Sequence, residues 1–441
     1  MKLANIDTRV LVAVLAVLAT IGCLVFVFLV FPAVQEIFDI NISPDEYDVL
    51  AWNMAQGKGF RAAHGEESVI RGPGYPAFLA LIYILTGGHN IAAVQVAQCF
   101  LFGLIVVLTF ILARRLAGEK TALLASAFIA VHPLLIWYTP RILIEIPFTI
   151  LLLLIFILAD MLIEKPGLIK ALLLGITIAL AALFKLSVLI FPAVVFLLLL
   201  IRKAGFKKAV GWTVVVGLVA VLLISPWTLR NAVVTGEFIP VHASLALSLM
   251  CGERYAANAF VSPLSTTKSL GEAYDAMTEV AEQSGYGRIV HPTRSLQQEI
   301  DLDRAVSQHF TQRHLADPLR FIGMSAIRLL QFWFLSTNPL FSLLMLAVNG
   351  IAIVLALVGW AKLKALAEPR RWLPGIFILS YALFHAAIIG QVRYTAPILP
   401  LLLTLASTGF LAIIAALRNR AANTDKPLGK NQLQADKLFS G

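Results

Sequence analysis

The sequence predicts an all-α polytopic membrane protein, and its composition carries this prediction. Of the 441 residues, 59% are hydrophobic and 14% are charged. In soluble domains about a quarter of all residues are charged, so a water-soluble enzyme is excluded. A disordered chain is excluded as well, because it would be far less apolar. Apolar runs long enough to cross a bilayer, about 20 residues each, recur along the chain. About ten such spans are predicted.

The predicted spans alternate with short polar segments. The fifth and sixth are separated by Lys185 alone, which predicts either a tight hairpin or one kinked helix. The first is too long for a signal peptide and is expected to be retained. The ten segments cover residues 10–32, 90–113, 121–138, 143–163, 170–184, 187–202, 209–228, 339–361, 373–390 and 393–417.

Basic residues predict the orientation, because cytoplasmic loops are enriched in Lys and Arg. The net charge of +10 is explained in this way, and nucleic acid is not an expected partner. Both termini are placed in the cytoplasm, and residues 418–441 form a basic tail. The cytoplasmic clusters are Arg114, Arg115 and Lys120; Lys165 and Lys170; Arg202, Lys203, Lys207 and Lys208; and Lys362, Lys364, Arg370 and Arg371.

One transmembrane domain is predicted over residues 1–417, with two long extracytoplasmic loops. Loop 33–89 contains an apolar stretch, Tyr75–Leu85, that is too short to span and is expected to lie in the interface. Loop 231–318 contains two predicted helices, Glu272–Gln283 and Gln297–Arg313. The amphipathic stretch Leu319–Leu335 is also placed in the interface. If it spans instead, the C-terminus lies on the other side.

The first long loop contains the acidic segment Asn41-Ile-Ser-Pro-Asp-Glu-Tyr-Asp48. A short helix is expected to begin here, with Asp45 and Asp48 on one face. A carboxylate at a membrane surface can accept a proton from a hydroxyl or hold a divalent cation. The alternative is simple helix capping. A divalent cation at Asp45, Glu46 and Asp48 is therefore left open.

Three arginines are predicted to lie at one depth on the extracytoplasmic side. Arg71 belongs to a stiff turn, Arg71-Gly-Pro-Gly-Tyr-Pro76, while Arg230 follows the interfacial Trp227 and Arg393 opens the last span. Arginine binds phosphate in bidentate fashion, so the three indicate an anion site beside a base. The alternative for Arg71 is snorkelling towards lipid headgroups.

Two further ionisable residues interrupt apolar segments. Glu145 lies just inside the fourth span. It is expected either to pair with Arg141, four residues earlier, or to face a cavity, because charged groups in spans are costly. Lys185 lies between two spans and is expected either to meet a phosphate or to snorkel.

These segments resemble, in this order, the GT-C glycosyltransferases that use polyprenyl-phosphate sugars. The nearest group is the family 39 type, which includes protein O-mannosyltransferases and the lipid A aminoarabinose transferase. The matching segments are Asp45-Glu46-Tyr47, Ala55-Gln-Gly-Lys-Gly-Phe60, Arg71-x-Pro-x-Tyr-Pro-x-Phe-Leu-Ala80, Leu143-Ile-Glu145, Pro226-Trp-Thr-Leu-Arg-Asn231 and Arg393-Tyr-x-x-Pro-x-Leu-Pro400. The chain departs from many relatives in having Arg71-Gly-Pro in place of Lys-Pro-Pro.

The resemblance implies a GT-C-like bundle whose extracytoplasmic loops carry interfacial helices. It also implies an inverting transferase of the cell inner (plasma) membrane. This enzyme moves a sugar from a polyprenyl-phosphate donor to a hydroxyl of a protein, lipid or glycan acceptor on the extracytoplasmic face. Asp45 matches the family's presumed general base and Glu46 completes the acidic pair. Arg71 is expected to touch the lipid phosphate.

The remaining site residues are inferred from their position. Depth and charge place Arg230 and Arg393 at the phosphate, with Tyr75, Glu145 and Lys185 in supporting roles. One rival is a transporter or flippase of a lipid-linked sugar, which would need no base and would carry charges near mid-span. Another is a transferase like the O-antigen ligases, against which the acidic loop after the first span argues.

Overall fold

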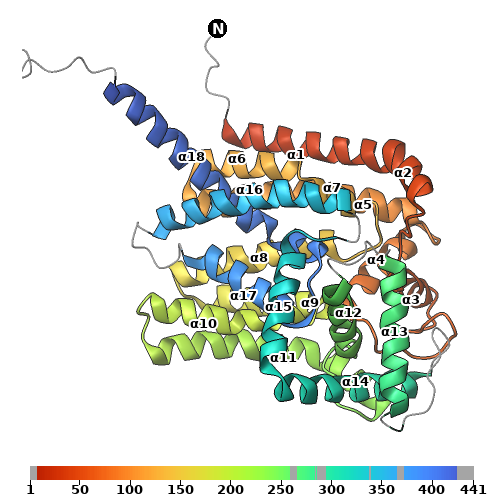
Figure 1. Ribbon diagram of the computed structural model, residues 1–441. Helices are drawn as coiled ribbons and strands as arrows, with labels where there is room; N and C mark the ends of the chain where they lie inside the picture. The colour runs from red at the N-terminus through yellow and green to blue at the C-terminus, as the bar shows by residue number, and fades with distance from the viewer. Residues whose placement is uncertain are drawn as a thin grey trace, which may run out of the picture.

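The computed structural model is a bundle of roughly parallel and antiparallel helices with a polar cap at one end (Figure 1). It describes residues 7–258, 266–283, 285, 295–336, 339–364 and 372–424. Within these residues, six helical stretches are long and apolar enough to cross a membrane. They are α1 to α2 (Thr8–Phe38), α5 (Ile91–Ala117), α8 (Glu145–Glu164), α11 (Phe206–Thr235), α16 (Pro339–Lys364), and the η4 turn (Val392–Ile398) with α18 (Leu399–Thr424).

Shorter apolar helices fill the rest of the bundle. They are α9 (Leu168–Phe184), η2 (Leu186–Ile190) with α10 (Phe191–Ile201), and α17 (Leu373–Ile388). A helix rises 1.5 Å per residue, so the 17 residues of α9 reach about 26 Å, close to the ~30 Å thickness of the hydrocarbon core. These helices correspond to three of the predicted spans.

The third predicted span, 121–138, is wrong as one continuous helix. It is divided into α6 (Glu119–Ala130) and α7 (Pro133–Tyr138). Val131 and His132 lie between them, and His132 has an extended backbone with φ −70° and ψ 118°. Proline disfavours a helical conformation in the residue before it and lacks the N–H that would continue the helix, so Pro133 explains the break.

The predicted break at Lys185 is confirmed, and its backbone settles how the two segments join. Lys185 is extended, with φ −157° and ψ 124°, between the end of α9 and the 3₁₀ turn η2. The alternative of a single kinked helix is therefore wrong. Both α9 and α10 pack against α11.

Burial varies strongly between the long helices. In α8, 78% of the most apolar window is buried, whereas the figure is 22% for α1, α11 and α16. The buried helix packs against α5, α9 and η4. Helix α8 is therefore the centre of the bundle, and the other three present wide apolar faces suited to lipid. The N-terminal end of α8 points towards the polar cap (Figure 1).

The polar cap is built from six helices of the two long loops. They are α3 (Tyr47–Ala55), α4 (Gly74–Leu85), α12 (Leu245–Asn258), α13 (Thr266–Gln283), α14 (Leu296–Ala316) and α15 (Pro318–Trp333). Helices α4, α13 and α14 confirm the predicted elements, and Ser295 begins α14 with a capping box. Helix α15 runs across the bundle direction (Figure 1) and is not among the candidate spans, which favours the interfacial alternative.

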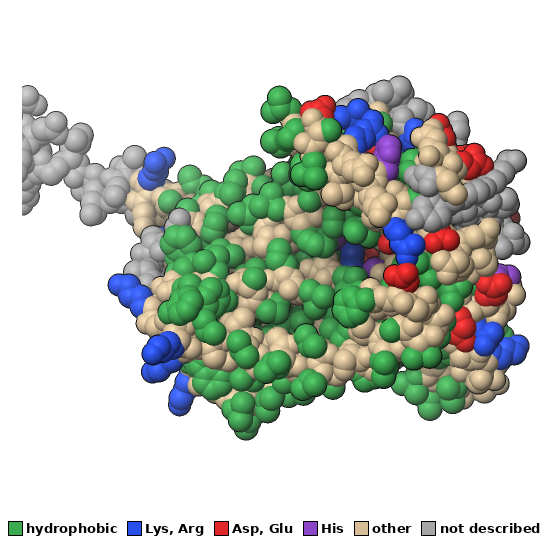
Figure 2. Space-filling view, turned by 90° about the horizontal axis from the view of Figure 1, so that it is seen from below, with side chains coloured by type: hydrophobic (Ala, Val, Ile, Leu, Met, Phe, Trp, Pro, Cys, Tyr) green, Lys and Arg blue, Asp and Glu red, His purple; other side chains and the backbone are tan. Residues whose placement is uncertain are grey.

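Charge separates along the bundle. On the face seen in Figure 2, a broad hydrophobic surface lies in the middle, the charged side chains at the end where α18 leaves are basic, and both signs of charge lie at the cap. Glu119 and Glu164 also lie at the end where α18 leaves. Helix α1 begins and α18 ends on the same side of the bundle (Figure 1). The surface is also hollowed where the apolar band meets the cap, with charged side chains inside the hollow (Figure 2).

Candidate functional site

A cavity of about 80 Å³ lies where the cap meets the bundle. It combines segments that are far apart in the sequence. Its wall is contributed by the entry to α3, the turn before α4, the start of α8, the end of α9, the segment around α12, and η4. The lining residues are Asp45, Tyr47, Ile70, Arg71, Gly72, Ile144, Glu145, Phe184, Lys185, His242, Ser244, Ser248, Arg393 and Tyr394.

Asp45 is held between two arginines in this cavity. Arg393 Nη1 donates to Asp45 Oδ2 at 3.0 Å and Arg71 Nη2 donates to Oδ1 at 3.4 Å. Arg71 Nε also donates to the Asp45 backbone oxygen at 3.0 Å. Burial opposes ionisation of Asp45, but the charges of Arg393 and Arg71 outweigh it and hold the pKa of the carboxyl below its usual value. Asp45 is therefore a carboxylate at neutral pH.

The turn that carries Arg71 needs its two glycines because it lies directly on the end of α9. A Cβ atom at Gly72 would come within 3.1 Å of the Leu183 carbonyl carbon, and one at Gly74 within 2.7 Å of Phe184 Cε2. The separation at Gly74 is shorter than real carbon atoms show, and the separation at Gly72 is tighter than most, with the Leu183 carbonyl oxygen closer still. The Arg71-Gly-Pro-Gly sequence thus fixes Arg71 and Lys185 to one rigid unit.

Glu145 opens α8 and faces the cavity. Its side chain is 3% exposed, and its Oε1 lies 3.8 Å from Arg393 Nε. The predicted pair with Arg141 is not formed. Arg141 instead donates from Nη2 to the Asn41 backbone oxygen at 3.3 Å and lies over the Tyr138 ring. Arg141 thus ties the first loop to the start of α8, leaving Glu145 with Arg393.

Three residues of the predicted site do not line the cavity. Glu46 has a left-handed backbone, φ 62°, and its side chain is exposed, so it turns away from Asp45. Asp48 accepts a hydrogen bond from Tyr83 and lies 2.8 Å from His89 Nε2. The prediction that Asp45 and Asp48 share one helical face is wrong, because α3 begins only at Tyr47. Tyr75 is fully buried and donates to Gln98 at 3.2 Å, which anchors α4 to α5.

These positions bear on the metal question. Asp45 is neutralised by two arginines, and Asp48 and Glu46 point elsewhere. Across the described part of the chain, no three His, Cys, Asp or Glu side chains are grouped so that they could hold a metal ion. A cation needs converging oxygen ligands without competing positive charge, so these residues do not fit one.

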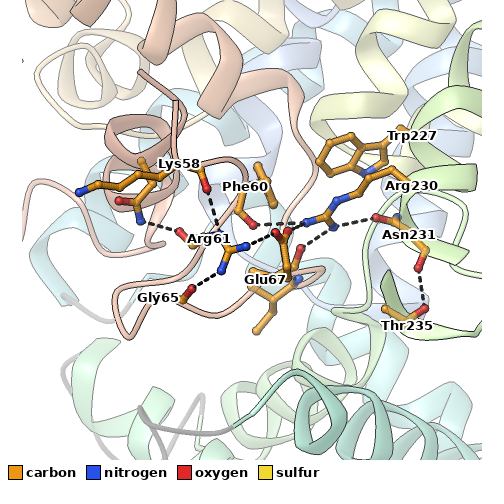
Figure 3. A network of polar contacts seen from close by, with 12 residues as sticks. Lys58, Phe60, Arg61, Gly65, Glu67, Trp227, Arg230, Asn231 and Thr235 are labelled. Carbon is orange, nitrogen blue, oxygen red and sulfur yellow. Dashed lines mark hydrogen bonds and ion pairs between the residues drawn. The ribbon is translucent and has the colours of Figure 1, made fainter. Parts of the chain in front are cut away.

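Arg230 also lies outside the cavity, so three arginines do not meet at one anion site. Arg230 pairs with Glu67, whose other carboxylate oxygen lies 3.0 Å from Arg61. The Arg230 guanidinium also lies over the Trp227 ring, 5.0 Å from the centroid. Figure 3 shows this network joining the end of α11 to the first loop. The direction of the Arg230 side chain is set by the loop that supplies Glu67, and it does not reach the cavity.

Sequence reasoning missed the neutral polar side of the cavity. His242, Ser244 and Ser248 line it, and Ser244 Oγ lies 2.8 Å from His242 Nδ1. Burial, with the charges of Arg71 and Lys185, lowers the pKa of His242 to about 4, so this imidazole is neutral. The segment carries no motif that would have singled it out. Tyr394 was also missed, although its neighbour Arg393 was identified.

Comparisons with known proteins agree with this fold. The apo oligosaccharyltransferase of Archaeoglobus fulgidus superposes with a TM-score of 0.56 at 14% identity, covering 96% of this chain and 52% of that chain. The archaeal oligosaccharyltransferase AglB from Archaeoglobus fulgidus, in complex with an inhibitory peptide and a dolichol-phosphate, gives 0.52 at 13% identity, covering 87% and 48%. The chain therefore has the GT-C type of fold, as the sequence predicted.

A family model gives a more specific match. Residues 70–229, which include the Arg71 turn, Glu145 and Lys185, match the dolichyl-phosphate-mannose-protein mannosyltransferase family. ArnT from Cupriavidus metallidurans bound to undecaprenyl phosphate is 15% identical, with a TM-score of 0.42 over 96% of this chain and 81% of that chain. The chain spans about half the length of the oligosaccharyltransferases. No curated protein sequence matches it significantly.

Proposed function

We propose that this protein is a membrane glycosyltransferase that moves a sugar from a polyprenyl-phosphate donor to an acceptor hydroxyl, with inversion at the anomeric carbon. One observation carries the proposal. An ionised carboxylate, Asp45, lies in a cavity beside Arg71, Lys185 and Arg393, where an apolar bundle meets a polar cap. A lipid phosphate can reach this level while its tail stays among apolar helices.

The chemistry requires two partners at opposite sides of the sugar. The acceptor oxygen forms a bond to the anomeric carbon while the bond from that carbon to the phosphate oxygen breaks. The acceptor proton passes to Asp45, which acts as general base. The electron pair of the broken bond leaves with the phosphate, whose added charge is stabilised by the basic side of the cavity. Glu145 orients Arg393 from the opposite side.

The donor class is supported by the comparisons as well as by the charges. The matching family is named for a dolichyl-phosphate-mannose donor and a protein acceptor. The similar fold of the archaeal oligosaccharyltransferase is described with dolichol-phosphate and with a peptide. For this chain the donor is a polyprenyl-phosphate sugar, and the acceptor class is protein, lipid or glycan.

The orientation follows from charge. The charged side chains visible in Figure 2 at the bundle end from which α18 leaves are basic. Along the chain, the Lys and Arg of the loops at this end outnumber Glu119 and Glu164, as expected of a cytoplasmic surface. We place both termini in the cytoplasm and the cavity on the extracytoplasmic side of the inner membrane. Reactivity of introduced cysteines towards an impermeant reagent in intact cells tests this placement, and labelling at the α5–α6 junction (Gly118) would contradict it.

The transporter alternative is less well supported. Transport sites lie near mid-membrane between broken helices, whereas Asp45 and Arg71 lie in the cap loops and Arg393 at the first turn of η4. A direct test uses purified protein in detergent with radiolabelled polyprenyl-phosphate sugars and a membrane extract. Label in a new product supports an enzyme, because detergent abolishes sidedness. Unchanged donor across all sugars tested, with intact folded protein, would contradict the proposal.

A further inference from the structure

The charged side chains around the cavity differ in whether they are already paired with a group of opposite charge. Two carboxylates and three cations line it. Both arginines are engaged with Asp45, and Arg393 also lies near Glu145 and donates from Nη2 to the Tyr394 hydroxyl at 3.1 Å. An incoming phosphate would have to compete with a carboxylate for either guanidinium.

Lys185 differs from the arginines. Its ammonium lies over the Tyr394 ring, with Nζ 3.4 Å from the centroid. Within the described residues, no carboxylate lies within 4.0 Å of this ammonium and no oxygen accepts a hydrogen bond from it. An ammonium carries three donors, and the ring face satisfies its charge only in part. Lys185 is thus the cavity cation that can accept an anion without losing a carboxylate partner.

The position of Lys185 is also fixed by the fold. Its extended backbone follows the last turn of α9, against which the Arg71 turn packs through Gly72 and Gly74. The side chain therefore reaches the cavity from the bundle side, where a lipid tail would lie, while Asp45 reaches it from the cap. A phosphate at Lys185 leaves the region near Asp45 for the sugar and the acceptor.

We propose that Lys185 is the direct ligand of the donor phosphate, held in place by the Tyr394 ring, and that Arg71 and Arg393 serve mainly to keep Asp45 ionised and oriented. This inference rests on the proposed function, which supplies the lipid phosphate as the ligand. It reassigns the main phosphate contact from the arginines singled out in the sequence to a lysine that had only a supporting role.

The test compares two ligands with the same tail. Geranylgeranyl phosphate and geranylgeraniol differ only in the phosphate, and their binding to the purified protein is measured by tryptophan fluorescence in detergent. Wild-type protein is expected to bind the phosphate at least ~10-fold more tightly, the gain expected of a charge-assisted hydrogen bond. Lys185→Met should bring this ratio close to one, and Lys185→Arg should retain most of it.

Lys170→Met is the matched control, because this lysine lies at the other end of α9 and donates to the backbone oxygens of Met161 and Lys165. The ratio should stay at the wild-type value. A Lys185→Met protein that keeps the preference would overturn the assignment, as would equal loss of both ligands, which indicates a structural role. Displacement by inorganic phosphate with equal affinity would overturn the choice of a lipid phosphate.

The binding ratio does not depend on turnover. If wild-type protein transfers no sugar but discriminates between the ligands through Lys185, the phosphate site stands and the proposed transferase function fails. If sugar is transferred and Lys185→Met still discriminates, the function stands and this inference fails.

Discussion

The contact between the Arg71 turn and the end of α9 makes Gly72→Ala a sharp perturbation. The added Cβ would lie 3.1 Å from the Leu183 carbonyl carbon, closer still to its oxygen, and 3.3 Å from Val241 Cγ1. Carbon atoms pack at about 3.5 to 4.0 Å, so the carbon contacts alone require a shift of about 0.4 to 0.9 Å. The closer contact with the Leu183 oxygen raises the required shift to about 1 Å. Overpacking of this kind costs about 1 to 3 kcal/mol. A displacement of ~1 Å at an active site can lower the rate by about 10²-fold.

The assay is transfer from a radiolabelled polyprenyl-phosphate sugar, with thermal unfolding in detergent measured in parallel. Gly88→Ala is the control, because a Cβ there meets nothing within 4 Å. We expect Gly72→Ala to fold with a lowered midpoint and to lose about 10²-fold in kcat/KM, while the control keeps both. Wild-type activity in Gly72→Ala would refute the argument that this packing positions Arg71 and Lys185.

Three further predictions concern charge. Because the pKa of Asp45 lies below its usual 3.8, the carboxylate is lost only as the pH falls below that value. Arg393→Gln should then move the acid limb of kcat/KM upward by about 1 to 3 pH units, and an unmoved limb would count against the pairing. Arg230→Gln should lower stability by up to ~1 kcal/mol and leave the donor KM within about twofold, so a large rise in KM would restore Arg230 to the phosphate site. Arg115→Met should destabilise by about 3 to 5 kcal/mol with donor KM unchanged, because Asp160 is fully buried beside Arg115; an unchanged melting midpoint would contradict this.

Much of the bundle could be predicted because long apolar runs have few alternatives in a membrane. The runs that became α5, α8 and α11 were located to within a few residues at most ends. The failure at 121–138 has a local cause, since His132 precedes Pro133 and cannot continue a helix easily. The prediction of one span over 121–138 followed the hydrophobicity of the segment and not the helix-breaking effect of Pro133. Helix α11 extends beyond its predicted apolar span to Thr235. Its last residues include polar ones, and hydropathy alone does not predict that such residues continue a helix.

The site was predictable where chain direction alone fixes a residue. Arg71 and Arg393 each stand just before an apolar segment, and Asp45 lies in the loop that follows the first span, so all three were expected near the membrane surface. The depth of a residue in the membrane does not determine the direction in which its side chain points, however. Arg230 pairs with Glu67 because the fold of the first loop places Glu67 beside it. Lys185 contacts the Tyr394 ring because the fold brings two distant segments together. Such pairings depend on tertiary structure, which spacing along the chain does not encode.

The central claim is that Asp45 is the general base, and transfer by Asp45→Asn tests it most directly. Asp48→Asn is the matched comparison, since Asp48 lies three residues away but contacts Tyr83 and His89 outside the cavity. We predict that Asp45→Asn binds geranylgeranyl phosphate yet transfers labelled sugar about 10²- to 10⁴-fold more slowly, while Asp48→Asn loses less than about 10-fold. Transfer by Asp45→Asn at the wild-type rate would contradict the account.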